Sequence, residues 1–244
     1  MRVRGRDNAG LIDELVCANH ILHGEGVLDG FGHISCRSDR DPERFLLSRS
    51  IAPATVAARD IMTFGLDGEP IDARRGKPYV ERFIHSEIYR ARPDVQAIVH
   101  SHSPAVIPFG ITGVNLRAVS HMGGFLGSQT PIFEIREAGG PATDMLIRDR
   151  NLGAALASTL AAYPYALMRG HGSIAVGISI KQVVYRAIYA EFNARLQSEA
   201  LRLGPINYLT EEEARGAMLA NDAVLDRPWD LWKSKLGKRK RRAS

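Results

Sequence analysis

The chain has 244 residues, of which 45% are apolar and 24% are charged, a composition typical of globular proteins rather than disordered or fibrous ones. No run approaches the roughly 20 consecutive apolar residues that a membrane-spanning helix needs, and no apolar signal segment follows the basic N-terminus. Cys17 and Cys36 are too few for a disulfide framework and do not form a CxxC motif. We therefore expect a cytoplasmic protein with no membrane partner.

The net charge of +5 belongs to the C-terminal end of the chain. Residues 233–244 carry seven basic residues and no acid, whereas the rest of the chain has 25 basic and 27 acidic residues. We therefore predict a near-neutral domain over residues 1–232 and a basic, disordered tail over residues 233–244. For this tail a solvated end is favoured over binding to nucleic acid or to an anionic surface, so a nucleic-acid partner is not expected.

Helical and β-like patterns alternate along the chain. Helical periodicity covers residues 8–23, 80–91, 103–110, 151–162 and 180–203. A further helix begins after Thr210, and Ser179 with Gln182 predicts a capping box for the long helix. Strand-like runs cover residues 32–37, 44–48, 61–66, 95–101, 166–169 and 174–176. This order predicts one α/β domain whose largely antiparallel or mixed sheet is covered by helices.

Four residues form a candidate metal site. On a strand, the side chains of His100 and His102 point to the same side with Cα atoms about 7 Å apart, close enough for both imidazoles to reach one metal ion. Such a pair alone is more often structural, but His171 lies at a Gly-His-Gly corner between two apolar strands. Glu81 begins a predicted helix, where stabilisation of the helix N-terminus is the alternative explanation.

Five segments together resemble the class II aldolase/adducin family over roughly residues 8–205. The segments are Gly32-His33-Ile34-Ser35, Leu47-Ser48-Arg49-Ser50, Lys77-Pro78-Tyr79-Val80-Glu81, His100-Ser101-His102 and Gly170-His171-Gly172. The resemblance implies a single domain with a central, mostly antiparallel sheet flanked by helices, assembled as a homo-oligomer, usually a tetramer. It also implies that His100, His102 and His171 bind a divalent metal and that Glu81 is both ligand and acid/base.

The substrate pocket implied by this resemblance differs from that of the sugar-phosphate enzymes of the family. Positions that bind phosphate in those enzymes hold His33, Ile51, Tyr79 and Val80 here. Phosphate requires backbone N–H groups, small hydroxyls and a close approach, which these larger side chains obstruct. We therefore expect a flatter and more apolar substrate.

The expected substrate contacts come from residues near these segments. Arg49 and Arg82 offer planar guanidinium groups suited to carboxylates, although surface solvation is an alternative explanation for both. The full predicted set of substrate-binding residues is Arg49, His33, Ser35, Ser50 and Arg82. The remaining helical histidines receive no role: His20, His23 and His85.

His121 is the second predicted catalytic residue beside Glu81. By the family resemblance it lies in a segment that contributes a catalytic tyrosine in the aldolases, and a histidine titrates near neutral pH, so it can accept or deliver a proton. An ordinary polar residue before the Met122-Gly123-Gly124 sequence is the alternative.

Together these features predict a metal-dependent carbon–carbon lyase. Within the resembling family we expect a decarboxylase of a hydroxy-aromatic dicarboxylate, with a 3-hydroxypyridine ring favoured, as in vitamin B6 degradation. It would release CO₂ through a metal-stabilised, enolate-like intermediate, with Mn²⁺ favoured and Zn²⁺ as the alternative. An aldolase or epimerase of a sugar or sugar phosphate is the first rival. An adducin-like structural module is the second, although such a module has no reason to keep four ligands.

Overall fold

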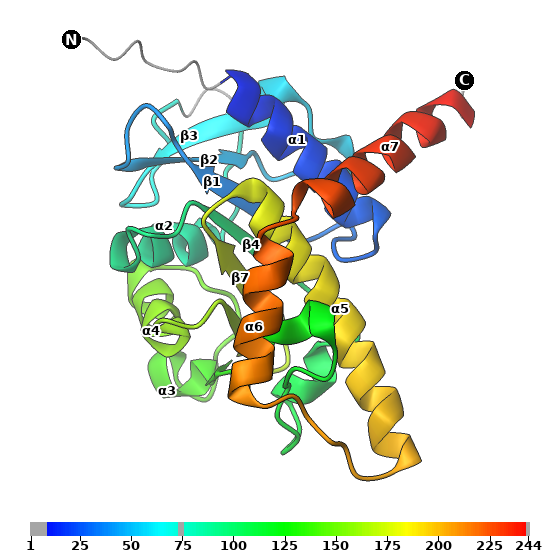
Figure 1. Cartoon of the computed structure of the whole chain (residues 1–244). Coiled ribbons are helices and arrows are strands. Elements are labelled where there is room, and N and C mark those ends of the chain that lie inside the picture. The colour runs from blue at the N-terminus through cyan, green and yellow to red at the C-terminus, as the bar shows by residue number, and fades with distance from the viewer. Residues whose placement is uncertain (1–8, 73–75, 243–244) are drawn as a thin grey trace, which may run out of the picture.

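The central sheet organises the molecule (Figure 1). The computed structural model describes residues 9–72 and 76–242, and in this part of the chain seven strands form one sheet in the order β3-β2-β1-β4-β7-β6-β5. Neighbouring strands are antiparallel except for the parallel β5–β6 pair, which confirms the prediction of a mostly antiparallel sheet. The strands are β1 (His33–Arg37), β2 (Arg44–Ser48), β3 (Ile61–Gly65), β4 (Ala97–Ser101), β5 (Ile132–Phe133), β6 (Tyr165–Met168) and β7 (Gly172–Gly177).

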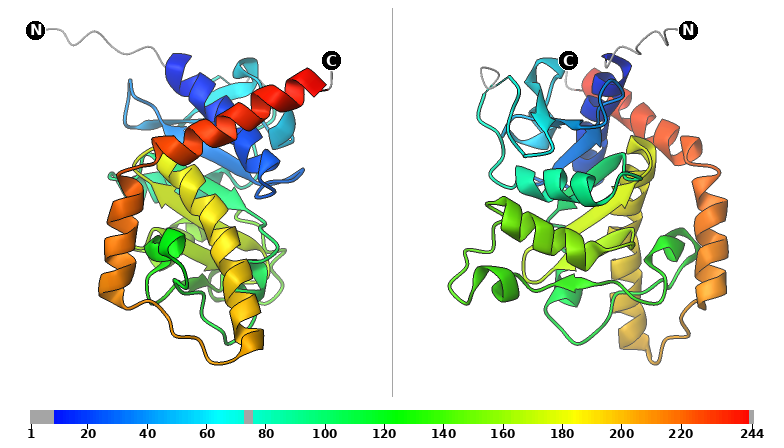
Figure 2. Two further views of the ribbon diagram at one scale, coloured as in Figure 1. Left: turned by 45° about the vertical axis from the view of Figure 1, so that its right-hand side comes forward. Right: turned by 90° about the vertical axis from the view of Figure 1, so that its left-hand side faces the viewer.

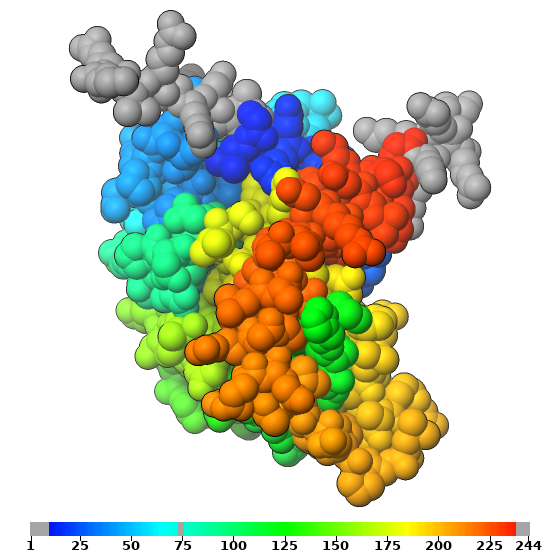
Figure 3. All heavy atoms as spheres, viewed as in Figure 1, coloured from blue at the N-terminus to red at the C-terminus, as the bar shows by residue number. Residues whose placement is uncertain are grey.

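Helices cover both faces of this sheet (Figure 2). The helices are α1 (Ala9–Gly24), α2 (Arg82–Ala91), α3 (Ile135–Gly139), α4 (Arg150–Leu160), α5 (Ile180–Leu203), α6 (Glu211–Asp222) and α7 (Asp226–Arg242), with short 3-10 turns η1 (Pro53–Thr55), η2 (Ala58–Asp60), η4 (Ile107–Gly110) and η5 (His121–Leu126). Helices α2, α3 and α4 lie on one face, and α1 and α5 lie on the other. Turn η5 separates α5 from α6, and α6 and α7 form much of the outer surface on that side (Figure 3). None of the helices in residues 9–72 and 76–242 is long and apolar enough to cross a membrane.

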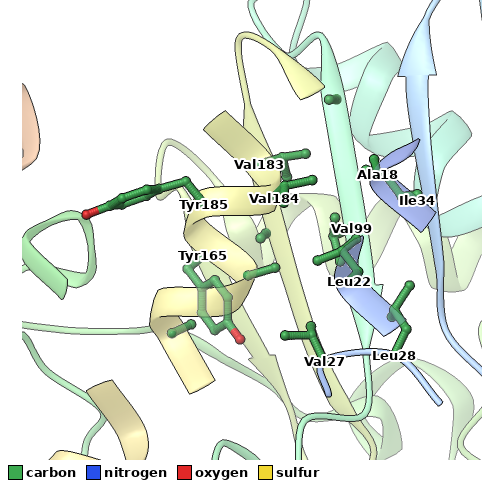
Figure 4. Packing of buried hydrophobic residues seen from close by; sticks show 14 of the residues in the cluster. Ala18, Leu22, Val27, Leu28, Ile34, Val99, Tyr165, Val183, Val184 and Tyr185 are labelled. Carbon is green, nitrogen blue, oxygen red and sulfur yellow. The ribbon is translucent and has the colours of Figure 1, made fainter. Parts of the chain in front are cut away.

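Alternating strand residues divide the core into two layers. Ile34 of β1 and Val99 of β4 pack with Leu22 of α1 and Val183 of α5 (Figure 4). Ile98, the neighbour of Val99, belongs instead to the cluster formed with α2 and α4. The β1 and β4 residues on the α2 side therefore share a layer with the N-terminal half of α2, and this layer holds the candidate site.

Two local predictions need correction. The helix predicted over residues 103–110 is reduced to the 3-10 turn η4, because Pro108 has no N–H to continue a helical hydrogen-bond ladder. The capping box of α5 is half formed: Ser179 accepts a hydrogen bond from the backbone of Gln182, but the Gln182 side chain accepts one from the Ile178 N–H instead.

The predicted boundary at residue 233 lies inside α7, which continues to Arg242. Trp232 is buried, Leu236 packs against the core beside α1, and Lys235 forms an ion pair with Glu25 at 2.8 Å. These contacts give the beginning of the expected tail an ordered helical structure. Residues 243 and 244 of that segment lie outside the described residues.

Candidate metal centre

Four side chains converge where β4 ends, β6 turns into β7 and α2 begins. His100 lies on β4 and His102 one residue beyond it, while His171 occupies the turn between β6 and β7. Because β4 pairs with β7, with Ser101 opposite Ser173, this turn is held beside the end of β4. Glu81 is the N-cap residue of α2, which brings its carboxylate to the same place.

The distances are those of a compact ligand cluster. The Nε2 atom of His102 lies 3.1 Å from the Nε2 atoms of both His100 and His171. Oε2 of Glu81 lies 3.6 Å from His100 Nε2 and 3.7 Å from His171 Nε2. One ligand atom from each of the four residues lies within 4.8 Å of all the others. The predicted four residues are therefore brought together.

Backbone contacts orient this cluster. His171 Nδ1 lies 2.9 Å from the carbonyl of Met145, and His100 Nδ1 lies 3.2 Å from the carbonyl of Ser173. A carbonyl can only accept, so each Nδ1 carries the proton and each Nε2 presents a lone pair to the centre. The Ile147 N–H donates to Oε1 of Glu81 at 3.0 Å, which leaves Oε2 facing the imidazoles.

The protonation states also suit a cation. Burial, and then the neighbouring imidazoles, lower the pKa of His102 to about 4. Burial alone would raise the pKa of Glu81, but the neighbouring His100 and His171 side chains and the Ile147 N–H outweigh it and lower the pKa to about 2. Unprotonated imidazoles and an ionised carboxylate are the forms that coordinate metals. Converging lone pairs repel one another, so the donor set fits a bound divalent cation.

A cavity of about 370 Å³ opens beside the cluster, and Glu81 and His102 form part of its wall. Its apolar side chains include Ile51, Tyr79 and Val80. By the family resemblance, these three residues stand at positions that bind phosphate in the sugar-phosphate enzymes. The cavity residues are Gly30, Phe31, Gly32, His33, Ser50, Ile51, Ala52, Tyr79, Val80, Glu81, His102 and Leu146. His33 and Ser50 of the predicted substrate-binding set therefore reach this space.

The two predicted arginines are held elsewhere. Arg49 donates from Nε to Asp60 at 2.8 Å, and Asp60 is buried. Arg82 donates to the backbone carbonyl of Gly68 and pairs with Glu69 at 3.0 Å. Neither arginine lines the cavity. These contacts hold both arginines outside the cavity, so neither is positioned for the predicted carboxylate contact.

Ser35 and His121 also lie outside the cavity. Ser35 is fully buried behind its wall, where its hydroxyl contacts His85 and Tyr89. His121 begins η5 on the α5 face of the sheet, where Asn221 of α6 donates to its backbone carbonyl at 3.0 Å. His121 is therefore separate from the metal cluster of its own chain.

His85, which received no role in the sequence analysis, contacts two residues of the predicted substrate-binding set. Its Nε2 lies 2.7 Å from Nδ1 of His33, and its Nδ1 lies 2.6 Å from Oγ of Ser35. One signal was available: Glu81, His85 and Tyr89 are spaced four residues apart, which puts them on one face of a helix. The backbone carbonyl of Met145 and the backbone N–H of Ile147, which contact His171 and Glu81, could not be recognised from the sequence.

The mostly antiparallel sheet flanked by helices, with three histidines and one glutamate gathered where β4 ends, is an α/β domain that carries a candidate metal cluster. Residues 13–198 match the family described as the Class II Aldolase and Adducin N-terminal domain, and the chain belongs to this family.

Proteins similar to the chain include two enzymes named as decarboxylases. Decarboxylase tropJ of Talaromyces stipitatus is 41% identical over 236 residues, covering 87% of this chain and 89% of that protein. The 3,4-dihydroxyphthalate decarboxylase of Arthrobacter keyseri is 31% identical over 210 residues, covering 81% of each. The solved structure of L-fuculose 1-phosphate aldolase from Glaciozyma antarctica has the same fold, with a TM-score of 0.78, 22% identity, and coverage of 95% of this chain and 91% of that chain.

Proposed function

We propose that the chain is a metal-dependent lyase that removes CO₂ from a hydroxy-aromatic carboxylate. One observation carries the proposal: a complete histidine and glutamate ligand set borders a cavity whose other walls are largely apolar. The family and the relatives named as decarboxylases support a lyase of the decarboxylase or aldolase type. The relatives named as decarboxylases also weigh against the adducin-like structural module as the main function.

His100, His102, His171 and Glu81 would hold the cation, with Mn²⁺ favoured and Zn²⁺ as the alternative. When bound, a divalent cation supplies Lewis-acid stabilisation of the negative charge that develops as CO₂ departs. The chain itself contributes orientation, because the carbonyls of Ser173 and Met145 and the N–H of Ile147 fix three of the four ligands.

Glu81 is the proposed proton carrier. Its low pKa makes it a carboxylate at neutral pH, so it can accept the proton of the substrate's ring hydroxyl. Glu81 then returns this proton to the ring carbon that bears the carboxylate, which regenerates the Glu81 carboxylate and leaves a non-aromatic keto form. The carbon–carboxylate bond breaks and CO₂ leaves. The electron pair of that bond returns to the ring, which restores aromaticity and leaves the ring oxygen ionised until it takes a proton from solvent. Proton and charge therefore balance over one turnover.

The cavity favours a ring over a phosphate. A phosphate buried without its hydrogen bonds would be penalised by several kcal/mol. An aromatic ring against Ile51, Tyr79 and Val80 gains about 25 cal/mol per Å² of apolar surface buried. His33 and Ser50 offer polar contacts for a second carboxylate. A 3-hydroxypyridine dicarboxylate of vitamin B6 degradation and a dihydroxyphthalate both fit this description.

The test is CO₂ release by purified protein reconstituted with Mn²⁺ or Zn²⁺. The panel contains 3-hydroxy-2-methylpyridine-4,5-dicarboxylate, 3,4-dihydroxyphthalate, L-fuculose 1-phosphate and ribulose 5-phosphate. We expect turnover of an aromatic acid that chelation or Glu81→Gln abolishes. A higher kcat/KM for either sugar phosphate would favour the aldolase or epimerase. Failure to bind metal or turn over any compound would favour the structural module.

A matched pair of variants tests the cavity wall. Val80→Ser removes apolar surface and restores a small hydroxyl, so kcat/KM for the aromatic acid should fall roughly threefold to tenfold. Val114→Ser makes the same exchange at a valine outside this cavity and should leave kcat/KM unchanged. Equal effects of the two variants would contradict the assigned cavity.

We also propose that the active form is a homo-oligomer, a tetramer by family resemblance. Exposed apolar side chains on α5, α6 and α7, including Phe192, Leu203, Leu219 and Leu231, support an interface on this side. His121 lies on the same side, so a catalytic role for it would operate across such an interface. Sedimentation showing only active monomer would overturn this proposal.

A further inference from the structure

A buried hydrogen-bond chain runs from α2 to the wall of the cavity. The Tyr89 hydroxyl lies 2.8 Å from Ser35 Oγ, and Ser35 Oγ lies 2.6 Å from His85 Nδ1. His85 Nε2 lies 2.7 Å from His33 Nδ1. His33 reaches the cavity, where its ring is tilted against that of Tyr79 with the centroids 4.5 Å apart. The hydrogen-bond chain therefore links the interior of the fold to the substrate space.

The four residues of this hydrogen-bond chain carry no charge. His33, Ser35, His85 and Tyr89 are at most 3% exposed. Burial, followed by the neighbouring histidine His100, lowers the pKa of His85 to about 3. The 2.7 Å contact between His85 Nε2 and His33 Nδ1 needs one N–H and one lone pair, which two neutral imidazoles supply. Each imidazole therefore carries one N–H and one lone pair, and the chain has a direction that the hydrogen positions must satisfy.

These hydrogen bonds can run in two directions, and only the first leaves no donor buried away from the cavity. The His33 Nε2–H that it requires opens onto the cavity, where water or substrate can accept it. In the first, Tyr89 donates to Ser35, Ser35 donates to His85 Nδ1, and His85 Nε2–H donates to His33 Nδ1. In the reverse, His33 Nδ1–H donates to His85 and His85 Nδ1–H donates to Ser35, which leaves a Ser35 or Tyr89 hydroxyl proton with no acceptor among the described residues. An unsatisfied buried donor is costly, so the first direction is favoured.

The first direction determines what His33 presents to the cavity. Its Nδ1 accepts from His85, so its proton lies on Nε2. Nε2 has no partner among the described residues, and the His33 ring centroid lies 5.1 Å from that of His100. The free N–H therefore faces the substrate space beside the candidate metal ligands.

We propose that His85 and Ser35 are positioning residues that lock His33 as the Nε2–H tautomer, and that His33 uses this N–H to recognise an anionic oxygen of the substrate. The tautomer assignment rests on the fold alone, whereas the identity of the anion as a carboxylate rests on the proposed function. Ser35 thus acts through His85 and His33 rather than by touching the substrate.

The direct test is nitrogen-15 NMR of the imidazoles in Zn²⁺-loaded protein without substrate, with the His33 signals assigned by their loss in His33→Asn. We expect the bonded proton on Nε2 and an unprotonated Nδ1. A proton on Nδ1 of His33 would overturn the proposal. This measurement needs no turnover, so it is independent of whether the protein proves to be a decarboxylase.

Two variants that each remove one buried hydroxyl test whether Ser35 and His85 hold His33 in the Nε2–H tautomer. Ser35→Ala leaves His85 Nδ1 without a donor or an acceptor, so His33 should become a mixture of both tautomers. Tyr89→Phe leaves the Ser35–His85 contact intact, so His33 should keep its Nε2 proton. If Ser35→Ala leaves the His33 tautomer unchanged, Ser35 does not determine that tautomer and the proposed positioning role is refuted.

The kinetic counterpart separates positioning from direct contact. His33→Phe removes the donor, so KM for the aromatic acid should rise roughly 10- to 100-fold, the scale of a hydrogen bond to a charged group. Ser35→Ala should raise KM only about twofold if about half of the molecules keep the Nε2–H form, with kcat little changed. Equal losses in both variants would contradict a role for Ser35 through the tautomer.

Discussion

We predict that Gly172→Ala lowers both the stability of the fold and its affinity for metal, because two strands approach each other closely at this position. A Cβ atom added at Gly172 would lie 2.2 Å from the backbone oxygen of Ser101 and 3.1 Å from Cδ2 of His102. Ser101 and Gly172 belong to the paired strands β4 and β7, so neither backbone can move without disturbing the sheet. Gly172→Ala therefore presses on the segment that carries two of the candidate ligands.

The size of the effect follows from this contact. Real Cβ atoms essentially never approach closer than 3.0 Å, so the strands must separate by about 0.8 Å. Overpacking of this kind costs about 1–3 kcal/mol of unfolding free energy. Because the shift moves His102 relative to His171, we also expect metal affinity to fall by about 10- to 100-fold, as for disturbed supports of metal ligands.

Gly170→Ala provides the control on the other side of His171. Gly170 has φ of +63°, which costs an alanine about 1–2 kcal/mol, but its Cβ would meet only the mobile end of Met145 at 3.2 Å and Ile111 at 3.6 Å. Denaturant unfolding should show both variants destabilised, whereas calorimetric metal titration should show weakened binding for Gly172→Ala alone. Wild-type metal affinity in a folded Gly172→Ala protein would refute the reasoning.

Three further predictions concern single side chains. His102→Ala should lose the metal while the protein stays folded, because the remaining ligands hold the ion poorly; retained metal and activity would remove His102 from the ligand set. Arg49→Gln should lower the unfolding free energy by about 1 kcal/mol at neutral pH. Burial alone would raise the pKa of Asp60, but the hydrogen bond from Arg49 outweighs it and lowers that pKa. The stability difference between wild type and Arg49→Gln should therefore disappear as pH falls below about 4, and a pH-independent difference would contradict this prediction. His121→Ala should keep its metal yet lose roughly 10²-fold in turnover, with activity recovered in mixed oligomers with Glu81→Gln subunits; normal turnover would remove His121 from catalysis.

The candidate histidine ligands could be recognised one by one because their signals are local. His100 and His102 are two residues apart at the end of a strand, and the glycines around His171 mark a sharp turn. The apolar cavity wall was predictable from Ile51 and its neighbours only through the family resemblance, since spacing alone says nothing about which loops meet. Local periodicity therefore identified the elements, and the resemblance identified how they meet.

The arginine and serine contacts were not predictable, since their partners come from tertiary structure. Arg49 is satisfied by Asp60, eleven residues later, after a chain reversal through η1 and η2. Ser35 contacts His85, fifty residues away, across the interface between β1 and α2. A sequence shows that a residue can bind a carboxylate, but a competing internal partner decides whether it is available.

Strand β1 explains why the candidate site and the core depend on each other. Ile34 and Cys36 face the α1 layer, whereas His33 and Ser35 point toward α2. In the antiparallel pairing of β1 with β4, His33 lies directly opposite His100. A shift of one residue would exchange the faces, burying polar groups in the α1 core and removing His33 from the cavity. The hydrophobic requirement that sets the register of β1 thereby also sets the position of the proposed anion-binding imidazole beside the proposed ligands.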